Sequence, residues 1–257
     1  MIDFESLVKR FGDRTVLKGL SFTVQEGEIV FILGTSGTGK SVLLKTLVGL
    51  LRADGGRVRI AGEDVTDLSE ENYLPIRRRC GMVFQHPALF DSLTIAENIA
   101  YGLMKHERVS LEAAMPRVRE CLALVGLTSG PGDGEPDIQL ESKLPTQISY
   151  GMQKRVSLAR TVAVGPKILL FDEPTTGLDP VTTRQINHLI RDLSRKTKTT
   201  SMVVSHDMDC ALEIADRIVV LDKGMIVEQG TVAEILKSKQ PLVVDFLAEA
   251  KARTVEQ

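Results

Sequence analysis

The chain has 257 residues, of which 43% are hydrophobic and 26% are charged, and its formal net charge is −2 at pH 7. A chain of this length can bury a substantial core, and its charge balance argues against a general nucleic-acid binder while leaving local basic patches open. No apolar run approaches the ~18 residues of a membrane span, the N-terminus has no signal-peptide core, and three scattered cysteines fit reduced thiols of a cytosolic protein rather than a metal-ligand pattern (Cys80, Cys121 and Cys210).

The first half of the chain predicts strands and one helix. Strands are expected at "LSFTV", "EIVFIL" and "GRVRIAG", and a helix from Lys40 to about Leu51 follows a glycine-rich loop. The unbroken apolar run "EIVFIL" is typical of a strand that is buried on both faces of a mainly parallel sheet.

From about residue 86 to residue 163 the pattern becomes helical. Thr94 and Glu97 fit a capping box that opens one helix, and Ser110 can cap the next. Pro116 lies inside that second helical pattern, so a kink or a late start is expected there. The stretch "TSGPGDGEPD" (Thr128–Asp137) predicts a solvated surface loop, because it is rich in Gly, Pro and acidic residues.

The sheet pattern returns with "KILLFD", "TTSMVVS" and "RIVVLD". Between the first two lies a predicted helix with Asp179 as its N-cap and Pro180 as its first residue. The run "LDKGMIV" indicates a hairpin that turns at Lys223 and Gly224. These elements together predict an α/β core interrupted by a helical insert.

The segment "GTSGTGKS" (Gly34–Ser41) follows a predicted strand and precedes a predicted helix, which is the context that a phosphate-binding loop requires. Glycines permit the positive φ values at which successive N–H groups converge on phosphate oxygens, and the helix N-terminus adds its partial positive charge. Lys40 would reach the β- and γ-phosphates, and Ser41 would bind Mg²⁺. The predicted nucleotide-binding residues of this segment are Gly34, Thr35, Ser36, Gly37, Thr38, Gly39, Lys40, Ser41 and Val42.

A second site agrees with this loop. The strand "KILLFDEP" ends in two adjacent carboxylates. Asp172 suits a Mg²⁺ ligand that acts through water, and Glu173 could polarise an attacking water as general base. An isolated acidic pair after a strand is usually a solvated turn, so this interpretation depends on the phosphate loop.

The order of "GTSGTGKS", "MVFQ", "ISYGMQKR", "ILLFDEP", "GLD" and "VVSHD" resembles the nucleotide-binding subunit of ATP-binding-cassette (ABC) transporters over essentially the whole chain. The resemblance implies an α/β fold: a RecA-like P-loop NTPase core (1–85 and 164–240) with an N-terminal antiparallel β subdomain, and an inserted α-helical subdomain (86–163). A C-terminal helical tail would follow (241–257). ATP and Mg²⁺ are the implied cofactors.

The resemblance also implies residue roles. Gln85 would contact Mg²⁺ and link the core to the insert, and His206 would hold the γ-phosphate and the attacking water beside the catalytic residues Lys40 and Glu173. Asp179 would lie at a dimer interface, Phe11 would stack on adenine and Val16 would line the same pocket. Without the family resemblance, the expectation would be that Gln85 merely ends a strand, His206 is structural, Asp179 is a helix cap and Phe11 belongs to the core.

The signature segment departs from the family pattern of Leu-Ser-Gly-Gly followed by Gln or Met. Here Tyr150 replaces the first glycine, while Ser149, Gly151, Met152 and Gln153 remain. By resemblance this segment contacts the ATP of a partner protomer. If position 150 needs a positive φ, a tyrosine there is strained; if it does not, only the ring must find room. The hypothesis is that Tyr150 slows closure of the ATP sandwich.

The resemblance implies two chains, most simply a homodimer, that sandwich two ATP molecules and drive integral-membrane permease subunits from the cytoplasmic face. "ALFDSLT" and the tail "QPLVVDFLAEA" resemble cassettes of MCE-associated (Mla-type) phospholipid transport, so lipid is the predicted cargo, with an MCE-domain protein and a small accessory subunit as further partners. Three alternatives remain: a small-solute importer such as an amino-acid importer, a slow-turnover nucleotide-gated binding module, and an ABC ATPase of repair or translation. Among the importers, the methionine and sugar types carry a large C-terminal domain that is not expected here. The tail is expected to pack as a helix on its own domain or on a partner.

Overall fold

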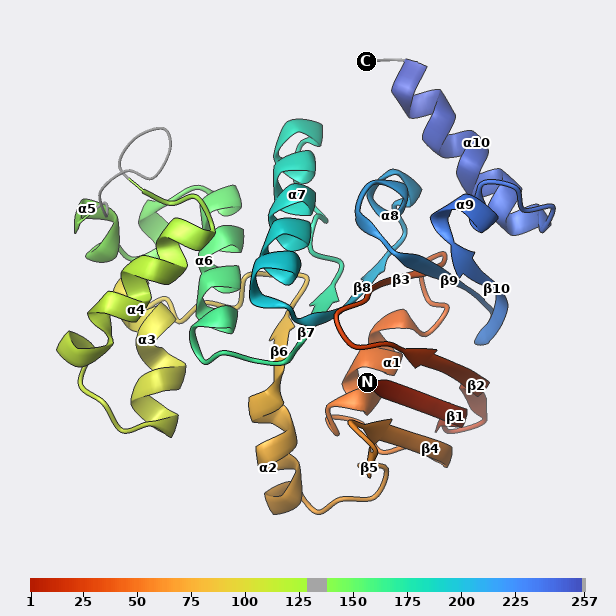
Figure 1. The fold of residues 1–257 in the computed structure, drawn as a ribbon, viewed down its shortest axis with the longest axis horizontal. Helices are drawn as coiled ribbons and strands as arrows, with labels where there is room; N and C mark the ends of the chain where they lie inside the picture. Colours follow the sequence, from red (N-terminus) through yellow and green to blue (C-terminus); the bar gives the residue numbers. More distant parts are fainter. Residues whose placement is uncertain (129–137, 256–257) are drawn as a thin grey trace.

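The computed structural model describes residues 1–128 and 138–255 of the chain (Figure 1). It confirms the predicted α/β fold, with an antiparallel sheet, a mainly parallel sheet and a group of helices set apart from both. In chain order the elements are β1 (Ile2–Phe11), β2 (Arg14–Val24), β3 (Ile29–Leu33), α1 (Lys40–Leu47), β4 (Gly55–Ile60), β5 (Glu63–Asp64), α2 (Glu70–Arg79), β6 (Cys80–Val83), α3 (Ile95–His106), α4 (Leu111–Leu124), α5 (Ile138–Glu141), a 3-10 turn (Pro145–Gln147), α6 (Tyr150–Ala163), β7 (Ile168–Asp172), α7 (Pro180–Thr197), β8 (Thr200–Ser205), α8 (Met208–Ile214), β9 (Arg217–Asp222), β10 (Met225–Thr231), α9 (Val232–Ile235) and α10 (Pro241–Val255).

The central sheet has six strands in the order β10-β9-β3-β8-β7-β6. Five of them are parallel, and β10 adds an antiparallel edge through the predicted hairpin, in which Lys223 and Gly224 both have positive φ. The crossover between neighbouring parallel strands leaves their carboxyl ends on one edge of the sheet. Ligand sites of open α/β sheets lie outside that edge.

The two faces of this sheet belong to two hydrophobic clusters, which explains the unbroken apolar sequence of β3. Ile29, Phe31 and Leu33 join the cluster with α3, α6, α7 and α8, whereas Val30 and Ile32 join the cluster with α1 and the four-stranded sheet. Alternate side chains of a strand point to opposite faces. A strand that is covered on both faces therefore needs apolar residues at every position.

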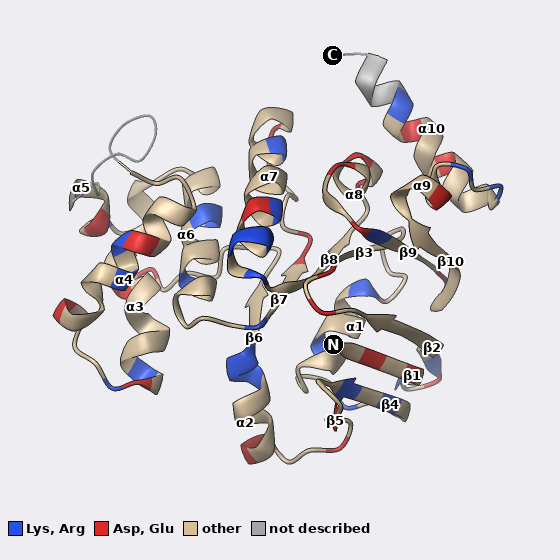
Figure 2. Cartoon of the chain, viewed as in Figure 1, with Lys and Arg blue, Asp and Glu red and all other residues tan. Residues whose placement is uncertain are grey.

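The second sheet is antiparallel, in the order β2-β1-β4-β5, and it packs over α1. The helices α3, α4, α5 and α6 lie on the opposite side of the molecule, beyond β6 and α7 (Figure 1). Acidic and basic residues are interspersed along the elements of both parts (Figure 2). None of the described helices combines the length and the low polarity that crossing a bilayer demands.

Local signals set most of the observed boundaries. The capping box of Thr94 and Glu97 opens α3, Ser110 caps α4, and Asp179 caps α7 with Pro180 as its first residue. Two boundaries differ from the prediction. Helix α1 ends at Leu47 rather than near residue 51, because Gly49 adopts φ 68°, a conformation that terminates helices.

Helix α4 does not start late: it runs from Leu111 to Leu124 with Pro116 inside. The Ser110 cap fixes its start, and the proline costs the helix a single backbone hydrogen bond. Of the predicted acidic loop, residues 129–137 lie outside the described residues. The tail forms α10, in which Val243, Phe246 and Ala250 are buried against the domain's own cluster.

Candidate functional site

Four segments meet at the carboxyl edge of the six-stranded sheet. The glycine-rich loop follows β3, Gln85 follows β6, Glu173 follows β7 and His206 follows β8. The register aligns Leu33 with Ser205 in β3 and β8, and Asp172 with Val204 in β7 and β8, so the four segments leave the sheet at the same level. Sheet topology therefore gathers side chains from distant parts of the sequence.

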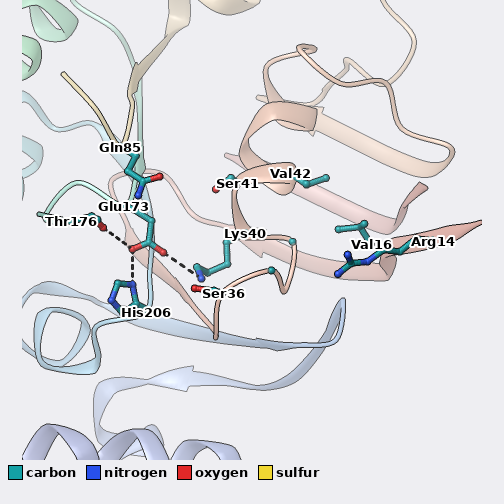
Figure 3. Close-up of a pocket in the computed structure, with 12 residues that line it drawn as sticks. Arg14, Val16, Ser36, Lys40, Ser41, Val42, Gln85, Glu173, Thr176 and His206 are labelled. Atoms are coloured by element: carbon teal, nitrogen blue, oxygen red, sulfur yellow. Dashed lines mark hydrogen bonds and ion pairs between the residues drawn. The ribbon is translucent and has the colours of Figure 1, made fainter. Parts of the chain in front are cut away.

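A cavity of 490 Å³ opens at this edge (Figure 3). Its volume falls within the range of small-molecule sites. In Figure 3 Lys40, Glu173 and His206 lie together at one side, while Arg14 and Val16 lie at the other. The lining residues are Arg14, Val16, Ser36, Gly37, Gly39, Lys40, Ser41, Val42, Gln85, Glu173, Thr176 and His206.

The glycine-rich loop is shaped for a ligand that approaches its backbone. Gly37 and Gly39 adopt φ of 79° and 105°, which side chains other than glycine rarely tolerate. Gly34 is needed for a different reason: a Cβ there would lie 2.6 Å from the carbonyl oxygen of Leu221. Gly39 caps α1 without a side-chain hydrogen bond. The N-terminus of α1 therefore presents its N–H groups to the cavity, as an anion site requires.

Lys40 projects its ammonium into the same space. Its Nζ donates to the carbonyl oxygens of Gly34 (2.7 Å) and Thr35 (3.1 Å) and forms an ion pair with Glu173 Oε1 at 3.3 Å. The Lys40 side chain is only 6% exposed. A buried cation next to a helix N-terminus provides strong electrostatic attraction for phosphate.

Glu173 occupies the centre of the site. Its Oε2 lies 2.9 Å from His206 Nδ1 and accepts a hydrogen bond from Thr176 Oγ1 at 3.4 Å (Figure 3). Its backbone has φ 48°, a left-handed conformation that is costly for a residue with a side chain. Strain of this kind at a convergence of charged side chains is characteristic of functional sites.

The donor set beside the loop fits Mg²⁺. Ser41 Oγ donates a 2.6 Å hydrogen bond to Asp172 Oδ1, so a hydroxyl and a carboxylate lie side by side at the start of α1. Magnesium prefers oxygen ligands and is usually held by one or two protein groups together with water and substrate phosphates. Ser41 and Asp172 would hold the ion, and Gln85 lies on the same cavity.

The structure brings most of the predicted nucleotide-binding residues to this cavity, with some differences. Phe11 is 47% exposed at the end of β1 and does not line the cavity; it pairs instead with Arg14 across the β1–β2 turn. Thr38 is buried and donates to Thr35 O at 2.9 Å, which closes the loop internally. The core interpretation of Phe11 is wrong, because its ring is exposed, while its stacking on adenine stays a prediction.

Sequence reasoning missed two lining residues, Arg14 and Thr176. Arg14 is the first residue of β2, two positions before Val16, and nothing in a lone arginine marks it as a ligand-facing group. Thr176 lies in the turn after Glu173, and its hydroxyl contact with that carboxylate depends on the turn conformation. Neither residue has a local signal that could have identified it.

The signature segment lies at the N-terminus of α6, away from the cavity lining. Ser149 is the N-cap, and its Oγ accepts from the Met152 N–H at 3.3 Å. Tyr150 is the first helical residue and has no positive φ, so the conditional expectation of strain does not apply. Its hydroxyl lies 3.4 Å from His86 Nδ1, and partial burial raises the pKa of the phenol.

The N-termini of α6 and α7 lie close together. A Cβ on Gly151 would be 3.3 Å from Thr182 Cγ2. Asp179 accepts from the Val181 and Thr182 N–H groups, both at 3.0 Å, which confirms its predicted role as a helix cap. Its role at a dimer interface stays a prediction.

Comparisons with known proteins agree with this geometry. The ABC transporter family model matches residues 17–176. The methionine import ATP-binding protein of Rhizobium johnstonii is 42% identical over 239 residues, which are 93% of this chain and 63% of that protein. The sulfate/thiosulfate import ATP-binding protein of Chromobacterium violaceum is 41% identical over 250 residues, which are 97% of this chain and 64% of that protein. The chain thus spans less than two thirds of the length of these relatives.

Two solved structures share the fold. A dimeric ATP-binding cassette in a post-hydrolysis state bound to ADP and phosphate is 32% identical, with a TM-score of 0.79 over 90% of this chain and 99% of that one. A protein of Clostridium perfringens that is part of an ABC transporter complex is 28% identical, with a TM-score of 0.81 over 93% of this chain and 91% of that one.

Proposed function

The chain belongs to the ABC transporter family; from this premise we propose that it is an ABC-type ATPase that uses ATP and Mg²⁺ and energises the import of a small solute through a membrane permease. The observation that carries the proposal is the identity of 41–42% with proteins named as methionine and sulfate/thiosulfate importers. Methionine is the first solute to test, because the matching relatives include methionine import proteins from several genera.

The site geometry supports hydrolysis of the terminal phosphate of ATP. Lys40 and the N-terminus of α1 bind the phosphates, and Ser41 with Asp172 would hold Mg²⁺, which would neutralise charge on phosphate oxygens. Glu173 orients the attacking water and accepts its proton. His206, whose Nδ1 lies 2.9 Å from Glu173 Oε2, holds that carboxylate in place. These groups act by positioning and by charge neutralisation, which are the main sources of catalysis in phosphoryl transfer.

The active assembly is proposed to be a homodimer. Ser149 and Tyr150 lie outside the lining of the chain's own cavity, so a second copy is needed to bring a signature segment to the nucleotide. A dimer of a related cassette bound to ADP and phosphate provides the precedent for such an arrangement. In this proposal the cassettes sit at the cytoplasmic face of the membrane, held there by the permease.

Lipid transport is the second candidate. It is supported by the "ALFDSLT" segment after Gln85 and by the apolar tail, whereas the named relatives favour the small-solute alternative. An MCE-domain partner has no support among these relatives. The two candidate functions require different partner proteins at the membrane, a small-solute-binding protein or an MCE-domain protein. Identifying the partner therefore distinguishes them.

Co-purification tests the proposal. The full chain would be tagged in its native cell, the membranes solubilised in mild detergent, and bound proteins identified by mass spectrometry. We expect a permease together with a small-solute-binding protein, and reduced methionine uptake in a strain that carries only a Glu173→Gln chain. Recovery of a permease with an MCE-domain protein would transfer the assignment to lipid transport. Recovery of no membrane protein would contradict transport.

A further inference from the structure

Lys154 is a buried lysine in the second turn of α6. It is 2% exposed, and within the described part of the chain its ammonium contacts a carbonyl and a ring rather than a carboxylate. Nζ donates to the carbonyl oxygen of Gln85 and lies 5.6 Å from the centroid of the Tyr150 ring, one turn earlier on the helix. Burial lowers the pKa of Lys154 to about 8, because desolvation disfavours the charged form. Burying a cation without a counter-charge is destabilising.

The contact joins two parts of the site that lie 69 residues apart in the sequence. The side chain of Gln85 lines the phosphate cavity, while its carbonyl oxygen is held from the signature helix. Because the carbonyl and the side chain belong to one residue, fixing the carbonyl fixes the point from which the amide reaches into the cavity. Lys154 thus controls a cavity residue without reaching the cavity itself.

Neighbouring contacts show that α6 holds the whole turn after β6. Arg160 donates to the carbonyl oxygens of Ala88 (2.7 Å) and Pro87 (3.3 Å), and the Tyr150 hydroxyl lies 3.4 Å from His86 Nδ1. Each residue from 85 to 88 therefore touches a side chain of α6. Lys154 is the member of this set that acts on the residue lining the cavity.

We propose that Lys154 is a positioning residue for ATP hydrolysis: its ammonium holds the main chain of Gln85 and thereby keeps the Gln85 amide at the phosphate cavity. It acts through Gln85 and does not touch the nucleotide. The proposal rests on the ATPase activity assigned above and is independent of the transported solute.

Steady-state hydrolysis by the purified full chain tests this role, with ATP and Mg²⁺ varied separately and nucleotide binding measured with a fluorescent ATP analogue. Lys154→Met keeps the apolar stem and removes the ammonium. We expect kcat to fall about 10- to 100-fold, because a misplacement of about 1 Å can cost up to about 10²-fold, with the nucleotide Kd within about twofold. Lys154→Arg keeps a cationic donor and should restore most of the rate.

Lys105→Met is the matched control. Lys105 also places its ammonium over a ring one turn earlier on its helix, 5.8 Å from the centroid of Tyr101, but it is exposed on α3. Its replacement should leave kcat at the wild-type value. An equal loss in both variants would show that the effect is unspecific and would overturn the proposal.

A double-mutant cycle separates positioning from a purely structural role. In a Gln85→Ala background, Lys154→Met should have little further effect on kcat, because the side chain that Lys154 positions is already absent. An undiminished effect in that background, or a kcat for Lys154→Met within about twofold of wild type, would overturn the proposal. If Lys154→Met does not fold, Lys154→Leu, which also lacks a donor, replaces it, and a wild-type rate in that variant has the same meaning. Normal ATPase kinetics without methionine uptake would contradict only methionine as the imported solute.

Discussion

Lys40 and Glu173 form an ion pair of 3.3 Å across the phosphate cavity, and their side chains are 6% and 14% exposed. The cation proposed to bind phosphate is thus paired with the carboxylate proposed to orient water. We expect a phosphate that enters the cavity to replace Glu173 as the anion next to Lys40. The carboxylate would then be released toward the position of the attacking water. The ion pair therefore keeps both buried charges paired until the nucleotide arrives.

Glu173→Gln is expected to retain ATP binding and to lower kcat by about 10²–10⁴-fold, the range attributed to a general base. The amide keeps the size of the carboxylate but cannot accept the proton of water. ATPase assays and equilibrium nucleotide binding on the same preparation test this expectation.

Glu213→Gln is its control, because Glu213 also pairs with a histidine, His188, at 2.5 Å, but on α8 and outside the cavity lining. We expect wild-type turnover from it. Near-normal hydrolysis by Glu173→Gln would remove Glu173 from its proposed role.

Tyr150→Gly is expected to raise the ATPase rate of the assembled complex several-fold. The ring stands at the first position of α6, between His86 and the ammonium of Lys154, where the nucleotide of a partner protomer would approach. Removing the ring gives that nucleotide free access to the N-terminus of α6. The glycine destabilises the helix by up to about 1 kcal/mol. Tyr150→Phe keeps the ring and should behave as wild type. An unchanged rate in Tyr150→Gly would refute the idea that Tyr150 slows closure.

Phe246→Ala is expected to lower the free energy of unfolding by about 3 kcal/mol, as large-to-small substitutions in packed sites do. Phe246 on α10 is 7% exposed and belongs to the cluster that includes α8. Val244→Ala, on the same helix but 45% exposed, should change stability little. Denaturant unfolding of the two variants decides whether α10 packs on its own domain; equal stabilities would contradict that packing.

The three thiols are expected to resist alkylation at pH 8 in the folded chain and to react fully after unfolding. Burial raises the pKa of Cys80 to about 12 and of Cys121 to about 11, and it also raises the pKa of Cys210. Only the thiolate is reactive. Above the ordinary value of 9.0 the unfolded chain releases thiol protons that the folded chain keeps, so stability falls as pH rises from 9 toward 11. Rapid labelling of the native chain at pH 8 would contradict this burial.

Several elements could be predicted because their signals are local. The caps Thr94, Ser110 and Asp179 start helices through hydrogen bonds to N–H groups two or three residues away, and the positive φ of Gly39 is a property of its own backbone. Helix α2 escaped prediction because its sequence is polar and contains Pro75, so its apolar periodicity is weak. The end of α1 was misplaced although its signal is also local, because the helix is terminated by Gly49 at φ 68°.

Residue order alone predicted the fold class, the phosphate loop and the acidic strand end, because backbone conformation and hydrophobic period depend on neighbouring residues. Three relationships emerged only from the folded chain: Lys40 pairs with Glu173, Arg14 and Thr176 line the cavity, and Lys154 holds Gln85. These contacts join strands and helices far apart in the chain. Their geometry comes from sheet order and packing, which residue order alone does not specify.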